Sequence, residues 1–584
     1  MKLNTRIISW ILGAIIMIAL SWWLVIYPRM TDLKTTINLS LDNNIESFDP
    51  AKVYSDDALI LSAQVLEPLY HYHYLKRPYE LTPLIAETLP LISSDQKNYI
   101  IKIKKNIYYH PHPAFKNQKR AVKAEDFVNQ VKRVAIKELA SPFWSTFAEI
   151  IPGFNEFSTL VGNDFEKMLK LDLKGIKALD DETLNISLNK PEPNLIYFLA
   201  MTVFSPIPKE LILYNKNDFN SSIIGTGPFM YVGMEQGAYI LKKFNDFRIE
   251  FYPTVGDRYA NVQNYIARSK EVIPYLEQIN FYPISTEEDR WNSFFNKKID
   301  ILAVPKSFLP DLFKKQQAHS AESLGDQVSV KHFPILSNRW LSFNWRDPIL
   351  GKNKKVRKAI AFAIDREKYI ADFSQRTSLK SHSILVPGIP GYYPSRDLPF
   401  DYDIEKAKLL LKEAGFGENK ILKLKYSTRG NQVTNINEAE FFKIQLAKIG
   451  IDLEIEVLSF SDFLKKGRAG ELQLFTDNWL FDYPDGENIF QLLISKNAPG
   501  INKSGYSNQE VDALYLKLRS TVDKDEKIEI MNAMEDMVMT DLPWVPLMYE
   551  NAYVLHYENV KNYRKSSVIR DFVKYLKVYS REGR

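Results

Sequence analysis

Hydrophobic and polar residues alternate along the first half of the chain in a way that predicts mostly β-strands. Residues 97–104 and 183–188 both alternate, which is the period of a strand that rests one face on a core. Between them, residues 124–139 carry apolar side chains at helical spacing, as an amphipathic helix requires. We therefore expect residues 33–334 to form a strand-rich region that helices interrupt.

The pattern changes after about residue 357, where helical and strand segments follow one another. Asp403 is placed to cap a helix, and residues 422–426 then alternate as a strand. Asn437 is placed to cap the next helix, and residues 453–457 alternate again. This order of helix, strand, helix and strand predicts that residues 357–541 form an α/β lobe of their own.

The N-terminus carries a membrane signal. Lys2 and Arg6 precede an uncharged apolar run from Ile7 to Tyr27, which is twenty-one residues long. A helix rises ~1.5 Å per residue, so this run can cross a hydrocarbon core of ~30 Å. The charges before the run favour a cytoplasmic N-terminus, which would place the rest of the chain outside the inner membrane.

A cleaved signal peptide is the alternative interpretation of residues 1–30. Residues 19–21 offer a small-residue cleavage site, but the apolar side chains continue beyond it. A secretory signal normally has a shorter apolar stretch. We therefore favour an uncleaved anchor, with residues 7–27 in the inner membrane.

The composition is that of an ordinary large globular protein. The chain has 584 residues, of which 45% are hydrophobic and 25% are charged. Its 76 basic and 71 acidic residues give a formal charge of +5 that is spread along the sequence, so nucleic acid is not an expected partner. The absence of cysteine excludes disulfides, thiolate metal sites, a cysteine nucleophile and a lipid-modified cysteine.

Motifs for catalysis or metal binding are missing. The glycines at 225 and 227 begin like a dinucleotide motif, but Pro228 follows and a tight turn is the better interpretation. We find neither a zinc-binding helix nor a serine elbow, and expect no enzyme and no cofactor. The pairs His71 and His73, and His110 and His112, suggest a metal, but no third ligand is evident, so we expect no metal site.

Aromatic residues surround acidic ones at residues 479–485. Asp482 lies between Phe481 and Tyr483, in a segment that follows an apparent strand at 472–475. A carboxylate in such surroundings is costly unless a cation pairs with it, and the ammonium group of a ligand could be that cation. The alternative is a loop with an exposed aspartate.

Short segments of the chain correspond in order and spacing to those of one known family. They are 48–50, 66–69, 84–87, 104–107, 123–127, 179–184, 225–229, 355–359, 364–366 and 479–484. On these segments the chain resembles the bacterial extracellular solute-binding proteins of family 5, which serve peptide ABC transporters, and in particular the oligopeptide-binding type.

The resemblance implies an α/β protein with the bilobal periplasmic-binding-protein fold (type II, large cluster), an extra subdomain, and one N-terminal apolar helix before it. The expected parts are a signal anchor or signal peptide at 1–30, lobe I at 31–73, 197–337 and 549–584, the extra subdomain at 74–196, and lobe II at 338–548.

The resemblance also implies a binding site and a function. Asp482 matches the family's aspartate that pairs with the α-amino group of a peptide, Trp479 and Tyr483 match its neighbours, and Trp340 falls on a strand that lines the peptide cavity. We expect a monomer on the periplasmic or extracellular side of the inner membrane that captures peptides and delivers them to ABC transporter permease subunits. The alternative is a membrane-tethered peptide sensor, or a binder of nickel, haem or sugar on the same fold.

Overall fold

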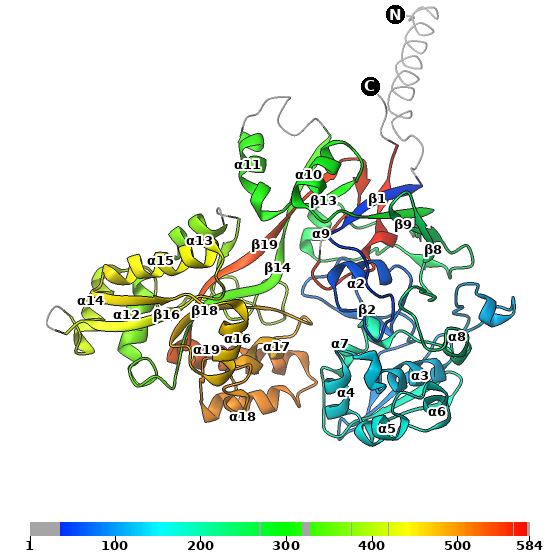
Figure 1. The fold of residues 1–584 in the computed structure, drawn as a ribbon, viewed down its shortest axis with the longest axis horizontal. Helices are drawn as coiled ribbons and strands as arrows, with labels where there is room; N and C mark the ends of the chain where they lie inside the picture. The colour runs from blue at the N-terminus through cyan, green and yellow to red at the C-terminus, as the bar shows by residue number, and fades with distance from the viewer. Residues whose placement is uncertain are drawn as a thin grey trace, which may run out of the picture.

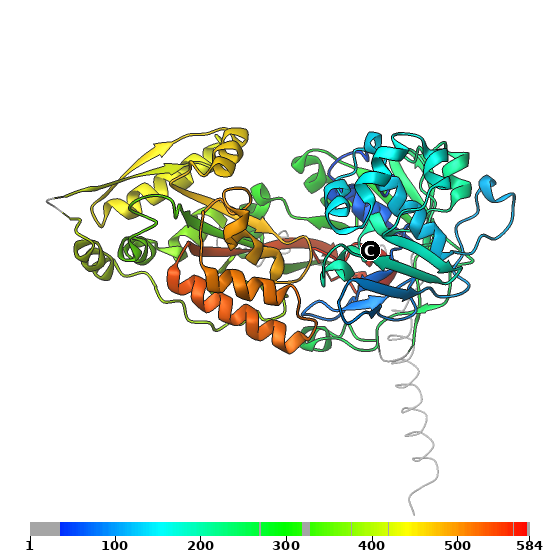
Figure 2. The same cartoon turned by 90° about the horizontal axis from the view of Figure 1, so that it is seen from below.

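The computed structural model of the protein describes residues 35–580 except 268–269, 318–326, 375–376, 418–419 and 565. It has two lobes side by side, and the long strands β14 (Val328–Phe343) and β19 (Trp544–Tyr557) run from one lobe to the other (Figure 1, Figure 2). The N-terminal apolar run that we expect to form a helix lies outside the described residues. Within the described residues, none of the helices combines the length and hydrophobicity needed to cross a bilayer.

One lobe is built on most of a seven-stranded sheet, which has the order β13-β19-β14-β18-β16-β17, with β15 paired to β19. The edge strand β13 lies in the other lobe, where its Ile301 shares a hydrophobic core with Ile37 and Ile279. The other strands of this sheet are β13 (Ile301–Ala303), β15 (Leu379–Lys380), β16 (Leu422–Ser427), β17 (Ile451–Glu456) and β18 (Leu474–Leu480). Its helices include α12 (Lys354–Ala363), α14 (Ile404–Glu413), α15 (Val433–Ala447), α16 (Phe460–Ala469), α18 (Gln509–Leu518) and α19 (Lys524–Asp541). The predicted α/β order after residue 357 is confirmed.

The two predicted helix caps in this lobe had different outcomes. Asp403 caps α14, because its side chain accepts a hydrogen bond from the backbone N–H of Lys406 at 2.9 Å. The cap predicted at Asn437 is wrong. Helix α15 already begins at Val433, and Asn437 lies inside it. The buried residues Phe441 and Phe442 hold that helix against the core of the lobe, so tertiary packing rather than a capping side chain sets its start.

The other lobe combines a four-stranded sheet with the last segment of the chain. The sheet has the order β1-β12-β9-β8, and β1 (Thr36–Leu41) is parallel to β12 (Gln278–Pro283). Strands β9 (Ala238–Lys243) and β8 (Phe229–Glu235) complete it. Ile37 and Ile279 share a hydrophobic core with Val573 and Val578 from the C-terminal segment, so the described part of the chain begins and ends in one lobe.

A separate core lies in the segment that we expect to be the extra subdomain. Its sheet has the order β4-β5-β7-β6. The strands predicted at 97–104 and 183–188 are confirmed as β5 (Asn98–Lys102) and β7 (Thr183–Ser187). The helix predicted at 124–139 is shorter than expected, because α3 (Ala124–Val134) ends before a separate 3-10 turn. The boundaries predicted for the lobes and the subdomain stay predictions.

The pairing of β14 with β19 is interrupted between the lobes. The two strands pair from Val328 to Pro334 and again from Asn338 to Ser342, with a register shift between these stretches. Proline has no N–H to donate to the ladder, so Pro334 weakens the pairing where it stops. An interrupted ladder of two strands is a connection that can bend.

Candidate functional site

The segment that contains Asp482 connects β18 to the short helix α17 (Glu487–Phe490). The strand predicted at 472–475 begins two residues later and continues to Leu480. Trp479 is therefore part of the sheet, where it lies opposite Asn338 of β14. Asp482 is the second residue after β18, so the end of this strand fixes where the segment begins.

Asn488 holds Asp482 and Trp479 together. Its side-chain nitrogen donates a hydrogen bond to Asp482 Oδ2 at 3.1 Å. Its side-chain oxygen accepts from the backbone N–H of Asp482 at 3.1 Å and from Trp479 Nε1 at 2.8 Å. Asn488 is 1% exposed, so this buried amide positions both predicted site residues. Sequence reasoning missed it, although it lies only six residues after Asp482.

The carboxylate of Asp482 is exposed to solvent and lacks a cationic partner. Among the described lysines and arginines, none forms an ion pair with Asp482. Nevertheless, desolvation by the surrounding protein raises the pKa of Asp482, and the hydrogen bond from Asn488 opposes this shift. A carboxylate that has lost part of its hydration and has no counter-ion gains stability when a cation binds to it.

The neighbouring acids differ from Asp482 because each has its own cation. Lys527 Nζ lies 2.6 Å from Asp485 Oδ2. Asp477 is paired with Lys503 at 2.5 Å and with Arg429 at 3.2 Å. The contrast singles out Asp482 as the acid of this segment that could bind a charged ligand.

The side chain of Tyr483 takes part in a contact between the two lobes. Its side chain is 7% exposed, and its hydroxyl donates to Glu487 Oε2 at 2.6 Å. Its ring stacks on Tyr197 with a centroid distance of 5.2 Å and an interplanar angle of 8°. Glu487 Oε2 also accepts a hydrogen bond from Asn194 at 2.9 Å, so the segment after β18 is attached to the opposite lobe. Sequence reasoning could not find Tyr197 or Asn194, because both lie far from residue 483 along the chain.

Trp340 lies in the core of its lobe. It is 3% exposed, and its ring stacks on Trp544 at a centroid distance of 4.2 Å. The sequence placed it on a long strand, and β14 is that strand. The ring is covered by protein in this conformation, so Trp340 is not part of the site that we propose.

The histidines that suggested a metal have structural contacts. His71 Nδ1 lies 3.2 Å from Asp571 Oδ2. His110 is buried with its Nε2 2.8 Å from the Gly227 carbonyl, and desolvation lowers its pKa to about 4. In the part of the chain that the structure describes, no three side chains of His, Asp or Glu are arranged to hold a metal ion.

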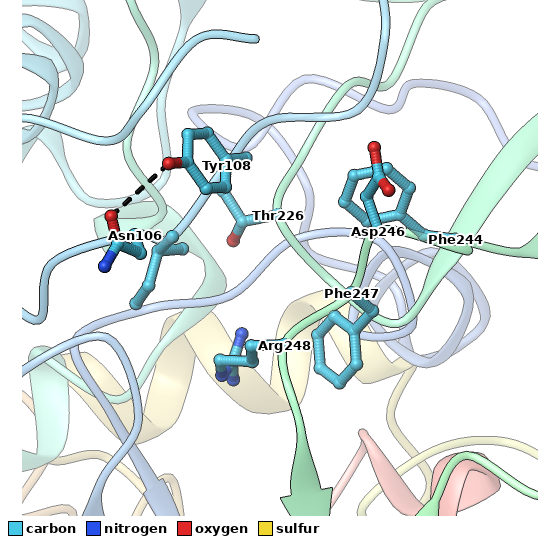
Figure 3. A pocket seen from close by; sticks show the side chains of 8 residues that line it. Asn106, Tyr108, Thr226, Phe244, Asp246, Phe247 and Arg248 are labelled. Atoms are coloured by element: carbon cyan, nitrogen blue, oxygen red, sulfur yellow. Dashed lines mark hydrogen bonds between the residues drawn. The ribbon is translucent and has the colours of Figure 1, made fainter.

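A small cavity lies away from Asp482, between residues 106–108 and 226–248 (Figure 3). Arg248 lines it, but its guanidinium binds Glu67 through two contacts of 2.7 Å. Thr226 donates to the same carboxylate at 2.9 Å. These polar groups satisfy one another, so neither Arg248 nor Thr226 is free to fix a ligand in the cavity.

Comparison with known families gives one match over most of the chain. The profile described as "Bacterial extracellular solute-binding proteins, family 5 Middle" matches residues 80–500. The chain is 24% identical over 540 residues to "Di/tripeptide-binding protein 2" of Pseudomonas aeruginosa (strain UCBPP-PA14), covering 90% of this chain and 92% of the relative. It is also 24% identical over 497 residues to "Dipeptide-binding protein" of Escherichia coli (strain K12), covering 83% and 84%.

Solved structures show the same fold. HbpA2 from Haemophilus parasuis superimposes with a TM-score of 0.77 at 21% identity, covering 93% of this chain and all of that one (100%). The periplasmic binding protein DppA from Helicobacter pylori, in complex with the peptide STSA, gives a TM-score of 0.64 at 25% identity, covering 94% and 99%. The mixed α/β periplasmic-binding-protein fold expected from the sequence is therefore confirmed.

Proposed function

The chain belongs to the bacterial extracellular solute-binding proteins, family 5, and we propose that it captures peptides outside the inner membrane and delivers them to the permease of an ABC importer. The exposed, unpaired carboxylate of Asp482 carries this proposal. It receives the α-amino group of the peptide, and Trp479 forms the adjacent wall. The two relatives described above are named as peptide-binding proteins, which supports the same class of ligand.

Recognition at the amino terminus of the ligand suits a binder of varied peptides. An extended peptide exposes backbone N–H and C=O groups that strand edges can satisfy whatever its sequence. Side chains can be accommodated through water in roomy pockets, which gives little selectivity. A charged anchor for the α-amino group then fixes the register of the ligand without reading its sequence. The lack of a cationic partner for Asp482 among the described residues favours a positively charged ligand over sugar or haem. An amine is favoured over nickel, because no three His, Asp or Glu side chains of the described residues are arranged to hold a metal ion.

A hydrolase that acts on peptides would release products, whereas a binding protein returns its ligand intact. Incubation of the protein with a defined peptide pool, followed by desalting and mass spectrometry, separates the two. We expect intact peptides to be retained by the protein and no cleavage products in the flow-through. New fragments that depend on the protein would contradict the proposal.

Peptide affinity should fall as the pH is lowered into the acid range. The pKa of Asp482 is raised above its usual 3.8 by desolvation, while the α-amino group of the peptide stays protonated. Acid therefore neutralises the carboxylate and removes the attraction. Calorimetric titrations from pH 7 to pH 4 should show weakening that begins above the usual aspartate pKa. The Asp482→Asn variant should lack this pH dependence, and a wild-type affinity that stays constant over the range would contradict the assignment.

The lobes should close on the ligand by bending where β14 and β19 lose register. Peptide contacts to both lobes would stabilise the closed form relative to the open one. Small-angle scattering of ligand-stripped and peptide-saturated protein should show a smaller radius of gyration with the peptide. The circular dichroism spectrum should stay the same, because the secondary structure does not change. An unchanged radius at confirmed saturation would count against closure.

We also propose that residues 7–27 anchor the protein in the inner membrane, with the body outside as a monomer. The apolar run is long enough to span, and its removal from lipid would expose large side chains at a cost of ~1.5–3 kcal/mol each. Fractionation should therefore find the protein with the inner membrane, and N-terminal sequencing should start at or near Met1. A soluble periplasmic protein that starts near Trp22 would show a cleaved signal peptide instead.

A further inference from the structure

Three apolar side chains and one lysine form an exposed patch on the lobe that holds the chain termini. Strands β10 (Glu250–Phe251) and β11 (Val272–Ile273) are antiparallel, and Phe251 lies opposite Val272. Phe251 is 44% exposed, Val272 is 56% exposed, and Ile249 beside them is 74% exposed. The exposed Lys270 places its Nζ 5.4 Å from the centre of the Phe251 ring. We call Ile249, Phe251, Lys270 and Val272 the apolar patch.

More lysines lie next to the apolar patch. Glu271, beside Val272, is paired with Lys577 of β21 (Lys577–Val578) at 2.6 Å. Lys561 of β20 (Val560–Lys561) lies directly opposite Lys577 in the strand pair. Lys561 is exposed, and none of the described carboxylates forms an ion pair with it. The surroundings of the patch therefore carry free positive charge.

The apolar patch lies near the point where the N-terminal segment joins the body. The carbonyl of Thr35 accepts hydrogen bonds from the backbone N–H groups of Glu277 at 2.7 Å and Gln278 at 3.0 Å. Val272 is only five residues before Glu277. The start of β1 and the end of the C-terminal segment, drawn in red, lie at the same end of this lobe (Figure 1). Five residues of extended chain span at most about 18 Å, so Val272 lies within that distance of the attachment point.

The link between the body and the apolar N-terminal run is short. Eight residues, 28–35, separate Tyr27 from Thr36. A fully extended chain spans at most about 3.6 Å per residue, so the link reaches no more than roughly 29 Å. If residues 7–27 lie in the membrane, this end of the lobe cannot move far from the lipid surface.

We propose that the apolar patch rests on the lipid bilayer and holds this lobe in a fixed orientation at the membrane surface. The inference rests on the anchor proposed above and goes beyond the binding of peptides. Aromatic and aliphatic side chains beside lysines are the usual composition of a surface that lies in the membrane interface. Phe251, Val272 and Ile249 would enter the headgroup region, while Lys270 and Lys561 would face anionic phosphates.

Single cysteines make the proposal testable, because the natural chain has none. Val272→Cys in the full chain places a thiol in the apolar patch. Leu409→Cys is the matched control, since Leu409 is 52% exposed on α14 of the other lobe. Each variant is labelled with an environment-sensitive fluorophore and reconstituted into phosphatidylglycerol-containing liposomes, with and without nitroxide-labelled lipid. We expect the label at 272 to be quenched several-fold more strongly than the label at 409.

A second set of variants tests whether the lysines of the patch contribute to the lipid contact. Lys270→Glu combined with Lys561→Glu should reduce quenching at position 272, and neutral lipid should have the same effect. Lys423→Glu, which changes a lysine that is 81% exposed on β16, should leave quenching unchanged. Equal quenching in all variants and lipids would overturn the role of the lysines.

The outcomes separate this proposal from the others. A full chain that fails to float with liposomes overturns both the anchor and the lipid contact. A chain that floats but shows equal quenching at 272 and 409 overturns the lipid contact alone. If the label at 272 is quenched or protected only after permease is added, the patch contacts the permease instead of the lipid. Peptide titration of the same liposomes reports on the proposed function independently, because failed peptide binding with intact quenching would overturn only that function.

Discussion

Asp482→Asn should weaken the binding of a free-amine peptide by about 2–4 kcal/mol, because the ligand ammonium loses its charged partner in a partly desolvated site. The substitution keeps the size of the side chain and can retain a contact with Asn488, so the loss reports on charge. Isothermal titration calorimetry with one peptide and both proteins measures the difference.

The control for this prediction is an exposed aspartate of the same lobe. Asp397→Asn removes the same charge from an exposed position and should leave the affinity within a few tenths of a kcal/mol, because screened surface charges contribute little. Equal affinities of the wild-type and Asp482→Asn proteins would remove Asp482 from the binding site. A similar loss in both variants would point to long-range electrostatics instead of a direct contact.

Asp49→Ala should destabilise the protein by about 3–5 kcal/mol, since it leaves a buried guanidinium without its counter-ion. Arg133 and Asp49 are 0% and 1% exposed, and two contacts of 2.6 and 3.0 Å join them. Among the described residues, the remaining hydrogen-bond partners of Arg133 are then neutral: the Asn217 side chain at 2.6 Å and the Gln130 side chain at 2.9 Å. Because α3 carries Arg133, the pair attaches that helix to the segment that follows β1.

Thermal unfolding measures this effect without assuming a single transition for a protein with two lobes. The transition that involves this region should move down by on the order of 10 °C. Glu182→Ala is the matched control, because it breaks the exposed pair with Lys105, whose side chain is 72% exposed. That variant should change the free energy of unfolding by less than about 1 kcal/mol, and an equally small effect of Asp49→Ala would contradict the account of the buried pair.

Local patterns predicted the elements of this fold well where side chains decide the local structure. The alternation at 183–188 predicted β7, and the spacing after Asp403 predicted both the cap and the helix α14. The cap predicted at Asn437 was wrong because α15 begins four residues earlier, at Val433. The sequence does not show that the packing of buried phenylalanines stabilises this additional turn. The length of β18 was underestimated because its last residues continue to pair with β14, which is a contact between distant segments.

The candidate site was predictable only in part for the same reason. Family resemblance pointed to Asp482, and the structure adds the buried amide of Asn488 that holds it. The burial of Trp340 could not be predicted, because the alternation of side chains along a strand defines two faces of the sheet but does not show which face other elements cover. Tyr197 meets Tyr483 only through the packing of one lobe on the other, so no local pattern could indicate that contact.

The central claim is that the protein binds peptides through their free α-amino group. Native mass spectrometry of ligand-stripped protein, mixed with equal amounts of a peptide and its N-acetylated form, tests this claim most directly. The account predicts an adduct with the mass of the free-amine peptide and little or none with the acetylated mass. Equal adducts of the two forms would contradict it. A protein that retains haem, nickel or sugar and shows no peptide adduct would contradict it as well.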